Sequence, residues 1–317
     1  MAKPLIYVLD TYYPDAIEKL KSSTSISFVY KDPEVENWRS KADGIMIRRE
    51  TRITGHDLSQ AKNLKVIIKQ GVGVDNVDLE AAKAHGIAVC NTPALNSEAV
   101  AELTLTLALS VARRVNELDR RVRSGENIVR ANVLGRSLHG KKIGVVGMGH
   151  VGRAVARKWR AMMEGPIIGY DPLVPKGAWK DLEHHRADSL EELLRQADVV
   201  SLHVPLNDST RHMIRAPHFE QMKKSAIFIN CARGEVIDEV ALLRALESQT
   251  IWGAGLDAMT VEPPTLKAYP ELLECGNVVM TPHIGGNTVE NQIISGKAAA
   301  EAAIAFFEGI DLPNRVV

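Results

Sequence analysis

The segment Lys141–Asp171, KKIGVVGMGHVGRAVARKWRAMMEGPIIGYD, decides the fold. It begins with an apolar run over residues 143–146 and enters a glycine-rich turn over residues 147–152. A helix-forming run over 153–163 and a second apolar run over 166–170 follow, and an aspartate closes the segment. Strand, glycine turn, helix, strand and acid stand in the order that a dinucleotide-binding unit needs.

The three glycines and the aspartate of this segment have physical roles in such a unit. Gly147 permits the tight turn, Gly149 lets the backbone approach a pyrophosphate, and Gly152 lets the helix pack close to the strand. The helix start presents unpaired N–H groups and the positive end of the helix dipole to the phosphates. Asp171 lies about 20 residues beyond the turn, where an acid binds the ribose hydroxyls. The segment therefore predicts a dinucleotide site rather than an ordinary strand-to-helix turn.

Composition limits the classes of protein that fit. The 317 residues suffice for about two domains, and Lys+Arg and Asp+Glu both number 39, so nothing indicates a basic surface for nucleic acid or a membrane. The cysteines, at positions 90, 231 and 275, lack metal-ligand spacing. We expect a reducing compartment and no metal site. Because no signal peptide or membrane-length apolar run is apparent, we expect a cytoplasmic globular protein.

The first part of the chain reads as an α/β unit. Short apolar runs predict strands that alternate with helices, which indicates a parallel sheet. The strands are expected at 5–9, 26–30, 44–47, 66–69 and 87–90, and the helices at 14–21 and 78–85. A turn over Gly71–Gly73 follows the fourth strand but has no third glycine. It either presents bare N–H groups to a small anion or simply joins a strand to a helix.

The remainder predicts a second α/β domain. One long helix is expected over 97–122, apolar and buried in its first half and charged in its second, either as core or as a subunit contact. Further strands are expected at 198–203, 226–229, 253–257 and 278–280, with helices at 189–196 and 238–248. An alanine-rich helix at 289–307 follows the second domain in the chain, and we expect it to return to the first.

The predicted fold class is therefore α/β, with two doubly wound parallel-sheet domains. A Rossmann-type cofactor domain is expected over 97–286, and a discontinuous, flavodoxin-like substrate domain over 1–96 and 287–317. Ligands of such folds bind at the carboxyl ends of the strands, so we expect a ligand cleft between the domains.

Three residues directly after predicted strands of the second domain suit hydride transfer to a keto acid. His283 can exchange a proton near neutral pH, and the planar guanidinium of Arg233 can hold a carboxylate. Glu262 can lie against the imidazole, favour its charged form and fix its tautomer. Taken singly, such residues are more often a solvated histidine or a salt-bridge partner.

The same segments resemble a known family. The sequences NCARGEVIDEVALLRAL (230–246), GLDAMTVEPP (255–264) and TPHIGG (281–286) are similar to signature segments of the D-isomer-specific 2-hydroxyacid dehydrogenases. KQGVGVDNVDLEAAKAHGIAVCNTP (69–93) resembles the D-3-phosphoglycerate dehydrogenase branch. The resemblance runs from about Gly44 to Gly286 in the family's order.

The resemblance implies roles for individual residues. Arg233, Glu262 and His283 would be the catalytic residues: the substrate-binding arginine, the partner of the histidine and the acid/base. Val72 and Gly73 would grip the substrate carboxylate, together with Arg233 and His283. The implied NAD contacts are Gly147, Gly149, His150, Val151, Gly152, Asp171, Pro172, His203, Val204, Pro205, Thr210, Cys231, Ala232, Asp257, Gly285 and Gly286.

The residues around Asp171 also predict which cofactor is used. Asp171 is followed by Pro172 and Leu173 rather than by an arginine. A carboxylate at this position accepts from the 2′-hydroxyl of NAD and repels the 2′-phosphate of NADP. We therefore expect a preference for NAD(H).

The substrate is predicted only as a small 2-keto or D-2-hydroxy acid. Arg48 and Lys69 either bind a substrate phosphate or are ordinary surface charges. Val72 stands where we would expect a threonine in a chain that closely resembles the phosphoglycerate enzymes. Residues 285–287 are Gly-Gly-Asn in place of the usual Gly-Ala-Ser. These departures leave phosphoglycerate-type, hydroxypyruvate and glyoxylate substrates open.

One other class remains open. Some relatives on this fold are NAD(H)-sensing corepressors that bind short peptides and keep a similar catalytic set, so that set alone does not exclude the role. Arg48 and the phosphoglycerate-like segment Gly71–Asp75 favour an enzyme. The resemblance also implies a homodimer through the helical region that begins at Ser97.

Overall fold

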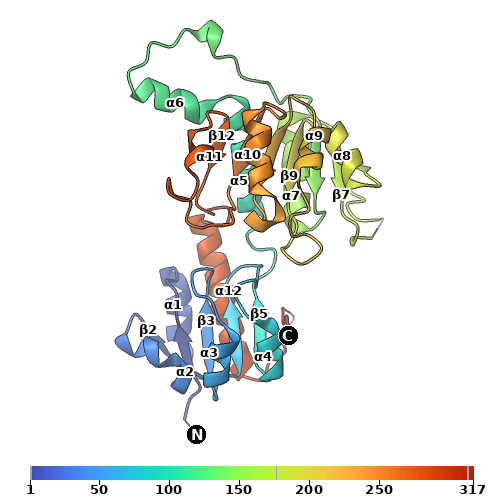
Figure 1. The fold of residues 1–317 in the computed structure, drawn as a ribbon. Coiled ribbons are helices and arrows are strands. Elements are labelled where there is room, and N and C mark those ends of the chain that lie inside the picture. The colour runs from blue at the N-terminus through green and yellow to red at the C-terminus, as the bar shows by residue number, and fades with distance from the viewer. Residues whose placement is uncertain (1, 176, 313) are drawn as a thin grey trace. The chain divides into compact units, whose positions relative to one another are not determined.

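The computed structural model describes residues 2–175, 177–312 and 314–317. The chain divides into two compact units, Met1–Asn96 with Gly286–Val317, and Ser97–Gly285 (Figure 1). Gly286, which was expected to close the second domain, lies in the first unit. The reason is local, because the Gly286 carbonyl accepts a 2.6 Å hydrogen bond from the side chain of Asn291 in the closing helix.

The first unit contains a five-stranded sheet in the order β2-β1-β3-β4-β5. All neighbouring strands pair in parallel, and the order matches the doubly wound flavodoxin-like arrangement that was expected. The strands are β1 (Leu5–Val8), β2 (Ser27–Tyr30), β3 (Gly44–Ile47), β4 (Val66–Lys69) and β5 (Ala88–Asn91).

Helices cover both faces of this sheet. On one face, α1 (Pro14–Lys21) and α12 (Val289–Phe307) pack on a core that includes Ile6 and Ile68, so the closing helix returns to the first unit. On the other face lie α2 (Trp38–Lys41), α3 (Gly55–Gln60) and α4 (Leu79–Ala84), with the 3-10 turn η1 (Pro33–Asn37). The elements α2, α3 and η1 were not predicted, because they are too short to show a helical period.

The second unit contains a seven-stranded parallel sheet in the order β12-β11-β10-β9-β6-β7-β8. Read from β8, this is the dinucleotide-binding order 3-2-1-4-5-6 with one further strand, which confirms the Rossmann-type prediction. The strands are β6 (Ile143–Val146), β7 (Ile167–Tyr170), β8 (His185–Arg186), β9 (Val199–Leu202), β10 (Ile227–Asn230), β11 (Gly253–Leu256) and β12 (Val278–Met280).

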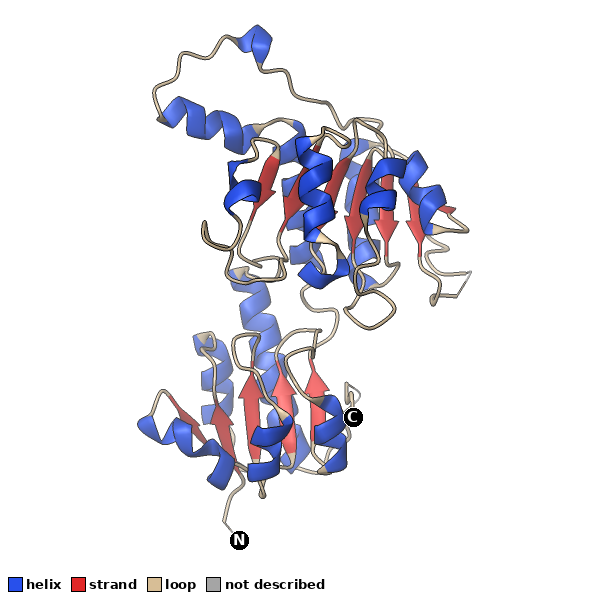
Figure 2. Cartoon of the chain, in the orientation of Figure 1, coloured by secondary structure: helices blue, strands red, loops and turns tan. Residues whose placement is uncertain are grey.

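This second sheet lies between two layers of helices (Figure 2). One face is covered by α5 (Ser97–Ala112) and α7 (His150–Met163), and the other by α8 (Leu190–Gln196), α9 (Ala216–Gln221) and α10 (Glu239–Glu247). The central strands β6, β9 and β10 are buried on both faces, as their continuous apolar runs require. A short helix, α11 (Pro270–Glu274), contacts β12, and the 3-10 turn η3 (Gly234–Val236) follows β10.

The single long helix expected over 97–122 is wrong. The structure has two helices, α5 and α6 (Val115–Arg123), and Arg114 between them has a left-handed φ of 56°. A later segment of the chain lies beside the end of α5, where the Arg136 N–H donates a 2.7 Å hydrogen bond to the Ala112 carbonyl. The guanidinium of Arg114 then forms a two-pronged ion pair with Glu117. These long-range and side-chain bonds replace the continuing helix.

Two smaller features complete the fold. Helix α7 begins at His150, three residues before the expected start, and a 3-10 turn, η2 (Arg130–Asn132), follows α6. Across the described chain, none of the helices combines the length and apolar character that crossing a bilayer requires.

Candidate active site

The glycine turn joins β6 to α7 through close backbone contacts. Gly147 has a left-handed φ of 97°, and a Cβ atom there would lie 2.5 Å from the His203 carbonyl oxygen. A Cβ atom at Gly152 would lie 2.1 Å from the Gly147 oxygen. Both positions therefore exclude any side chain.

Gly149 differs from these two glycines. It is the N-cap of α7, and a Cβ atom there would meet nothing within 4 Å. The open side of the turn thus lies at the start of a 14-residue helix, whose first N–H groups are anion-binding groups. His150 and Val151 form the first turn of that helix.

Asp171 follows β7 and is locked by the backbone. Its Oδ2 accepts a 2.9 Å bond from the Met148 N–H in the glycine turn. Its Oδ1 accepts from the N–H groups of Leu173 and Val174 at 2.9 and 3.2 Å. A carboxylate has about four acceptor positions, so one remains for a ribose hydroxyl. The anion-binding helix start and this fixed acceptor fit the pyrophosphate and adenosine ribose of NAD.

His203 follows β9 and packs beside the glycine turn. Its Nε2 lies 2.8 Å from the Ser201 hydroxyl, and its Nδ1 is inaccessible, without a partner in the part of the chain described. The residue as a whole is only half-buried, but the environment of the ring controls its protonation. Burial lowers the pKa of His203 to about 3, so the imidazole is neutral at physiological pH.

The loop that follows β9 supplies the next predicted cofactor residues. The Thr210 hydroxyl donates a 2.6 Å bond to the Pro205 carbonyl and closes the loop beyond Val204. Pro205 is exposed, as is Pro172 after β7. All these residues lie after the carboxyl ends of their strands, on the ligand-binding edge of a parallel sheet.

The loop after β10 carries Arg233 and is organised by Asn230. This fully buried amide donates to the Arg233 carbonyl at 2.9 Å and accepts from the Ala232 N–H at 3.1 Å. It also donates to the Ala258 carbonyl after β11, at 3.2 Å. Burial raises the pKa of the neighbouring Cys231 to about 12, so this thiol is protonated and is not a nucleophile. The half-buried Arg233 side chain bonds the Ala232 carbonyl through Nη1 at 2.8 Å.

Asp257, after β11, anchors the loop that carries His283. The side chain is buried, and its Oδ1 accepts from the Thr281 hydroxyl at 2.6 Å and the Ile284 N–H at 2.8 Å. Its Oδ2 accepts from the Gly285 N–H at 2.8 Å. Three donors on one short loop therefore depend on this carboxylate, which fixes the backbone on both sides of His283.

His283 and Glu262 are brought together by this arrangement. Nδ1 of His283 lies 2.9 Å from Oε1 of Glu262, and the same oxygen accepts from the Met259 N–H at 3.0 Å. The two side chains are 21% and 15% exposed, so the pair is partly shielded from water. Arg233, Glu262 and His283 follow the adjacent strands β10, β11 and β12, as predicted from the order of the motifs.

The predicted substrate residues of the first unit lie near the carboxyl ends of β3 and β4. The Arg48 guanidinium donates to the Thr11 carbonyl at 2.8 Å. The backbone N–H of Arg48 donates to the Asp10 carboxylate. Lys69 is 7% exposed and donates to the Gln70 carbonyl at 2.9 Å, so it is not an ordinary surface charge. Val72, in contrast, is 43% exposed.

The turn that contains Val72 and Gly73 is held from outside. The Gly71 N–H donates to Thr92 at 2.7 Å, and the Val72 carbonyl accepts from Asn91 at 2.7 Å. The hydrogen bonds described for this turn do not use the N–H groups of Val72 and Gly73.

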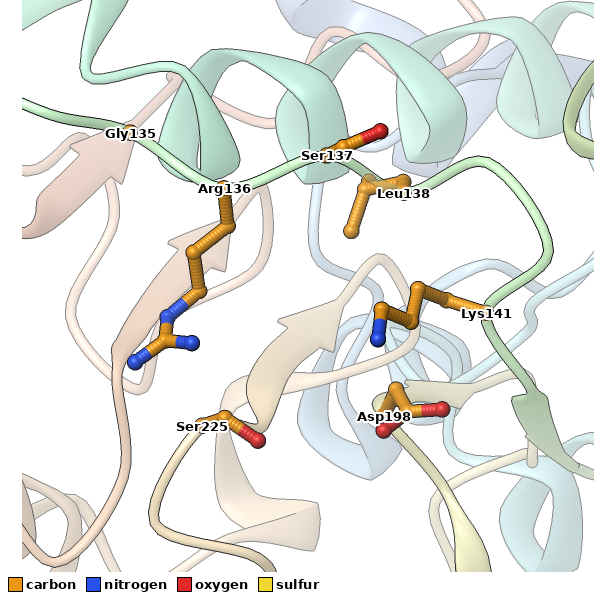
Figure 3. A pocket seen from close by; sticks show the side chains of 7 residues that line it. All are labelled: Gly135, Arg136, Ser137, Leu138, Lys141, Asp198 and Ser225. Carbon is orange, nitrogen blue, oxygen red and sulfur yellow. The ribbon is translucent and has the colours of Figure 1, made fainter.

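One cavity of the second unit lies away from these residues. A cavity of about 330 Å³ opens at the amino ends of β6 and β9, between Lys141 and Asp198 (Figure 3). It is lined by none of the candidate residues, and we assign it no role. Among the residues that the structure describes, no group of three or more His, Cys, Asp or Glu side chains could hold a metal ion.

Sequence reasoning missed two residues beside Glu262. Glu239 and Tyr269 bind the backbone of the turn that carries it. No motif or period marks them, because each acts through a hydrogen bond to a residue distant in the sequence.

Comparisons with known proteins identify the family of the chain. Residues 105–285 match the family model "D-isomer specific 2-hydroxyacid dehydrogenase, NAD binding domain". The chain is 39% identical to a D-3-phosphoglycerate dehydrogenase of Methanocaldococcus jannaschii, over 98% of this chain and 60% of that protein. It therefore spans less than two thirds of that relative. It is 37% identical to a hydroxypyruvate reductase of Thermotoga maritima, over 92% and 94% of the two chains.

A solved structure extends the agreement to the fold. The D-lactate dehydrogenase of Aquifex aeolicus, complexed with NAD and lactic acid, superposes with a TM-score of 0.85 at 30% identity, covering 99% of each chain. The chain belongs to the D-isomer-specific 2-hydroxyacid dehydrogenases, a family of NAD-dependent oxidoreductases, and its residues 105–285 match that family's NAD-binding domain.

Proposed function

We propose that this protein transfers a hydride between C4 of a bound nicotinamide and C2 of a small D-2-hydroxy or 2-keto acid. The observation that carries the proposal is the 2.9 Å contact between His283 Nδ1 and Glu262 Oε1. A histidine held by a carboxylate is suited to general acid/base catalysis. A bound nicotinamide would accept or give the hydride, while the protein's own side chains transfer the proton and hold the charged substrate.

The tautomer of His283 decides which ring nitrogen exchanges a proton with the substrate. Because the Glu262 carboxylate accepts a hydrogen bond from the Nδ1–H of His283, the neutral imidazole carries its lone pair on Nε2. In oxidation, Nε2 of His283 takes the C2 hydroxyl proton as the hydride leaves C2. In reduction the imidazolium returns that proton to the carbonyl oxygen. Arg233 stabilises the charge on the carboxylate or the developing carbonyl oxygen.

The first unit supplies the remaining predicted substrate contacts. We propose that the N–H groups of Val72 and Gly73 bind the substrate carboxylate and that Arg48 and Lys69 bind a phosphate where the substrate has one. Phosphohydroxypyruvate, hydroxypyruvate and glyoxylate are the candidate keto acids. The place of both cations at the carboxyl ends of β3 and β4, on the ligand-binding edge of a parallel sheet, supports the phosphate role.

Turnover and binding must be measured separately to test this function. NADH consumption is followed with phosphohydroxypyruvate, hydroxypyruvate, glyoxylate and bulkier 2-keto acids. We expect His283→Ala to lower kcat at least about a hundredfold on the best substrate, while NADH titration by fluorescence gives an unchanged Kd. Near-normal turnover of His283→Ala would show the acid/base assignment to be wrong. No turnover on any keto acid, with NADH-dependent peptide binding, would favour the corepressor role instead.

We further propose a cytoplasmic homodimer that associates through the α5–α6 region. Within residues 115–134 the described structure exposes four apolar side chains, Val115, Val122, Val129 and Leu134, each at least 53% exposed. Such exposure is typical of a protein interface. Light scattering after gel filtration should give twice the 34.8 kDa of one chain, and a monomeric mass would contradict the dimer.

A further inference from the structure

The turn that carries Glu262, residues 259–262, is held by two side chains from outside it. The Thr260 N–H donates to Oε1 of Glu239 at 2.8 Å. The Val261 N–H donates to the hydroxyl of Tyr269 at 2.7 Å. That hydroxyl lies 3.2 Å from Oε2 of Glu239, so the two side chains also bind each other.

Both side chains stand at the starts of helices. Glu239 is the first residue of α10, and Tyr269 is the N-cap of α11. Only 7% of Tyr269 is exposed, and burial raises its pKa to about 12. The hydroxyl therefore keeps its proton, donates it to Glu239 and accepts from Val261.

The backbone of the turn is consequently tied at three consecutive N–H groups. Met259 N–H donates to Glu262 itself at 3.0 Å, Thr260 N–H to Glu239, and Val261 N–H to Tyr269. Val261 directly precedes Glu262. The position of the Glu262 backbone, and with it the contact of its carboxylate with His283, therefore depends on the Tyr269 hydroxyl.

We propose that Tyr269 and Glu239 are positioning residues that hold the Glu262 carboxylate against His283. The inference rests on the proposed function of the Glu262–His283 pair. Neither residue acts on substrate; both act through the turn. Their effect can be large, because a displacement of about 1 Å in catalytic groups costs up to about a hundredfold in rate.

Two conservative substitutions test the inference. Tyr269→Phe keeps the buried ring and removes only the hydroxyl, and Glu239→Gln keeps the shape and removes the charge. Steady-state reduction of hydroxypyruvate by NADH should show kcat lower by about tenfold or more in each, with the Kd of NADH unchanged. Glu191→Gln is the matched control, because Glu191 is likewise an acid in the first turn of a helix, α8. It should keep kcat within about twofold of the unmodified protein.

A double-mutant cycle separates positioning from a merely structural role. In a Glu262→Gln background, Tyr269→Phe should change kcat by less than about twofold, because the carboxylate that it positions is gone. The same large factor in both backgrounds would overturn the inference, as would a normal kcat in Tyr269→Phe alone. If circular dichroism shows that Tyr269→Phe is unfolded, the same double-mutant cycle is measured with Glu239→Gln in place of Tyr269→Phe.

The cycle also distinguishes this inference from the function on which it rests. Wild-type turnover in both Glu262→Gln and His283→Ala would disprove the role of the pair itself. If Glu262→Gln lowers kcat while Tyr269→Phe and Glu239→Gln do not, the role of the Glu262–His283 pair stands and only the positioning role is overturned.

Discussion

Gly234 lies directly against the backbone of Met259: a Cβ atom at Gly234 would fall 2.0 Å from the Met259 carbonyl carbon. It would also fall 2.1 Å from the nitrogen of Thr260. Gly234 follows Arg233, and Met259 begins the turn that carries Glu262. The contact therefore joins the loops of two predicted catalytic residues without any side chain between them.

Gly234→Ala should disturb both loops. The added methyl group meets backbone rather than a flexible side chain, so the turn must shift, at a cost of about 1–3 kcal/mol. We expect a lower melting temperature and a kcat reduced at least about tenfold. Gly276→Ala is the matched control, because a Cβ atom there has ordinary contacts of 3.7 Å or more. Equal stability and turnover of the two variants would contradict the prediction.

Asp257→Asn should weaken the loop that carries His283. The amide keeps one acceptor oxygen, whereas the carboxylate uses both oxygens for three donors. Leaving a buried N–H unpaired costs about 1–3 kcal/mol, and His283 loses its fixed backbone. The free energy of unfolding measured in urea and the kcat should therefore both fall.

Asp198→Asn serves as the control for that variant. Asp198 also accepts a loop N–H, from Lys142 at 2.9 Å, and pairs with Lys223 at 2.8 Å, but it lies at the amino ends of the strands. It should lose stability and keep turnover. A fully active Asp257→Asn would show that the anchor is unnecessary.

Cofactor selectivity should depend on Asp171. We expect kcat/KM with NADH to exceed that with NADPH by at least about tenfold, because the fixed carboxylate repels a 2′-phosphate. Asp171→Asn removes the charge and should narrow this ratio, mainly through KM. Comparable efficiency of the unmodified protein with NADPH would refute the NAD preference.

His203 should make the fold sensitive to acid. Burial lowers its pKa to about 3, below the unfolded value of about 6.5. Above about pH 6.5 neither state binds this proton, but between about 6.5 and 3 only the unfolded state does. The free energy of unfolding should then fall by up to about 1.4 kcal/mol per pH unit as the pH decreases through this window.

Urea unfolding at pH 7, 6 and 5 checks this pH dependence. Between pH 7 and 5, His203→Gln should lose about 2 kcal/mol less than the unmodified protein. His139→Gln, at an exposed histidine, should keep the original slope. Identical slopes for all three proteins would mean that His203 becomes protonated in the folded state.

Much of the molecule was predictable because its signals are local. The turn Gly147–Gly152 identifies a dinucleotide unit, since its backbone geometry excludes other residues at two of its three glycines. Apolar runs such as 143–146 and 226–229 predicted central strands, and the parallel order then placed Arg233, Glu262 and His283 after neighbouring strands. The family comparisons and the fold confirm this level of prediction.

Other features depended on contacts that leave no mark in a single stretch of sequence. The helix break at Arg114 follows from the return of residue 136 to the Ala112 carbonyl. The short helices of the first unit lack a readable period. The roles of individual site residues toward cofactor and substrate stay predictions.

By itself, the sequence determined the class of fold, the dinucleotide turn and the family, because steric limits on glycine and the burial of apolar runs act within a few residues. Only the tertiary structure decided that Glu262 meets His283, that Asp257 holds the His283 loop, and that Tyr269 and Glu239 hold the turn of Glu262. These are hydrogen bonds between residues 8 to 28 positions apart, and their geometry exists only once the strands are paired.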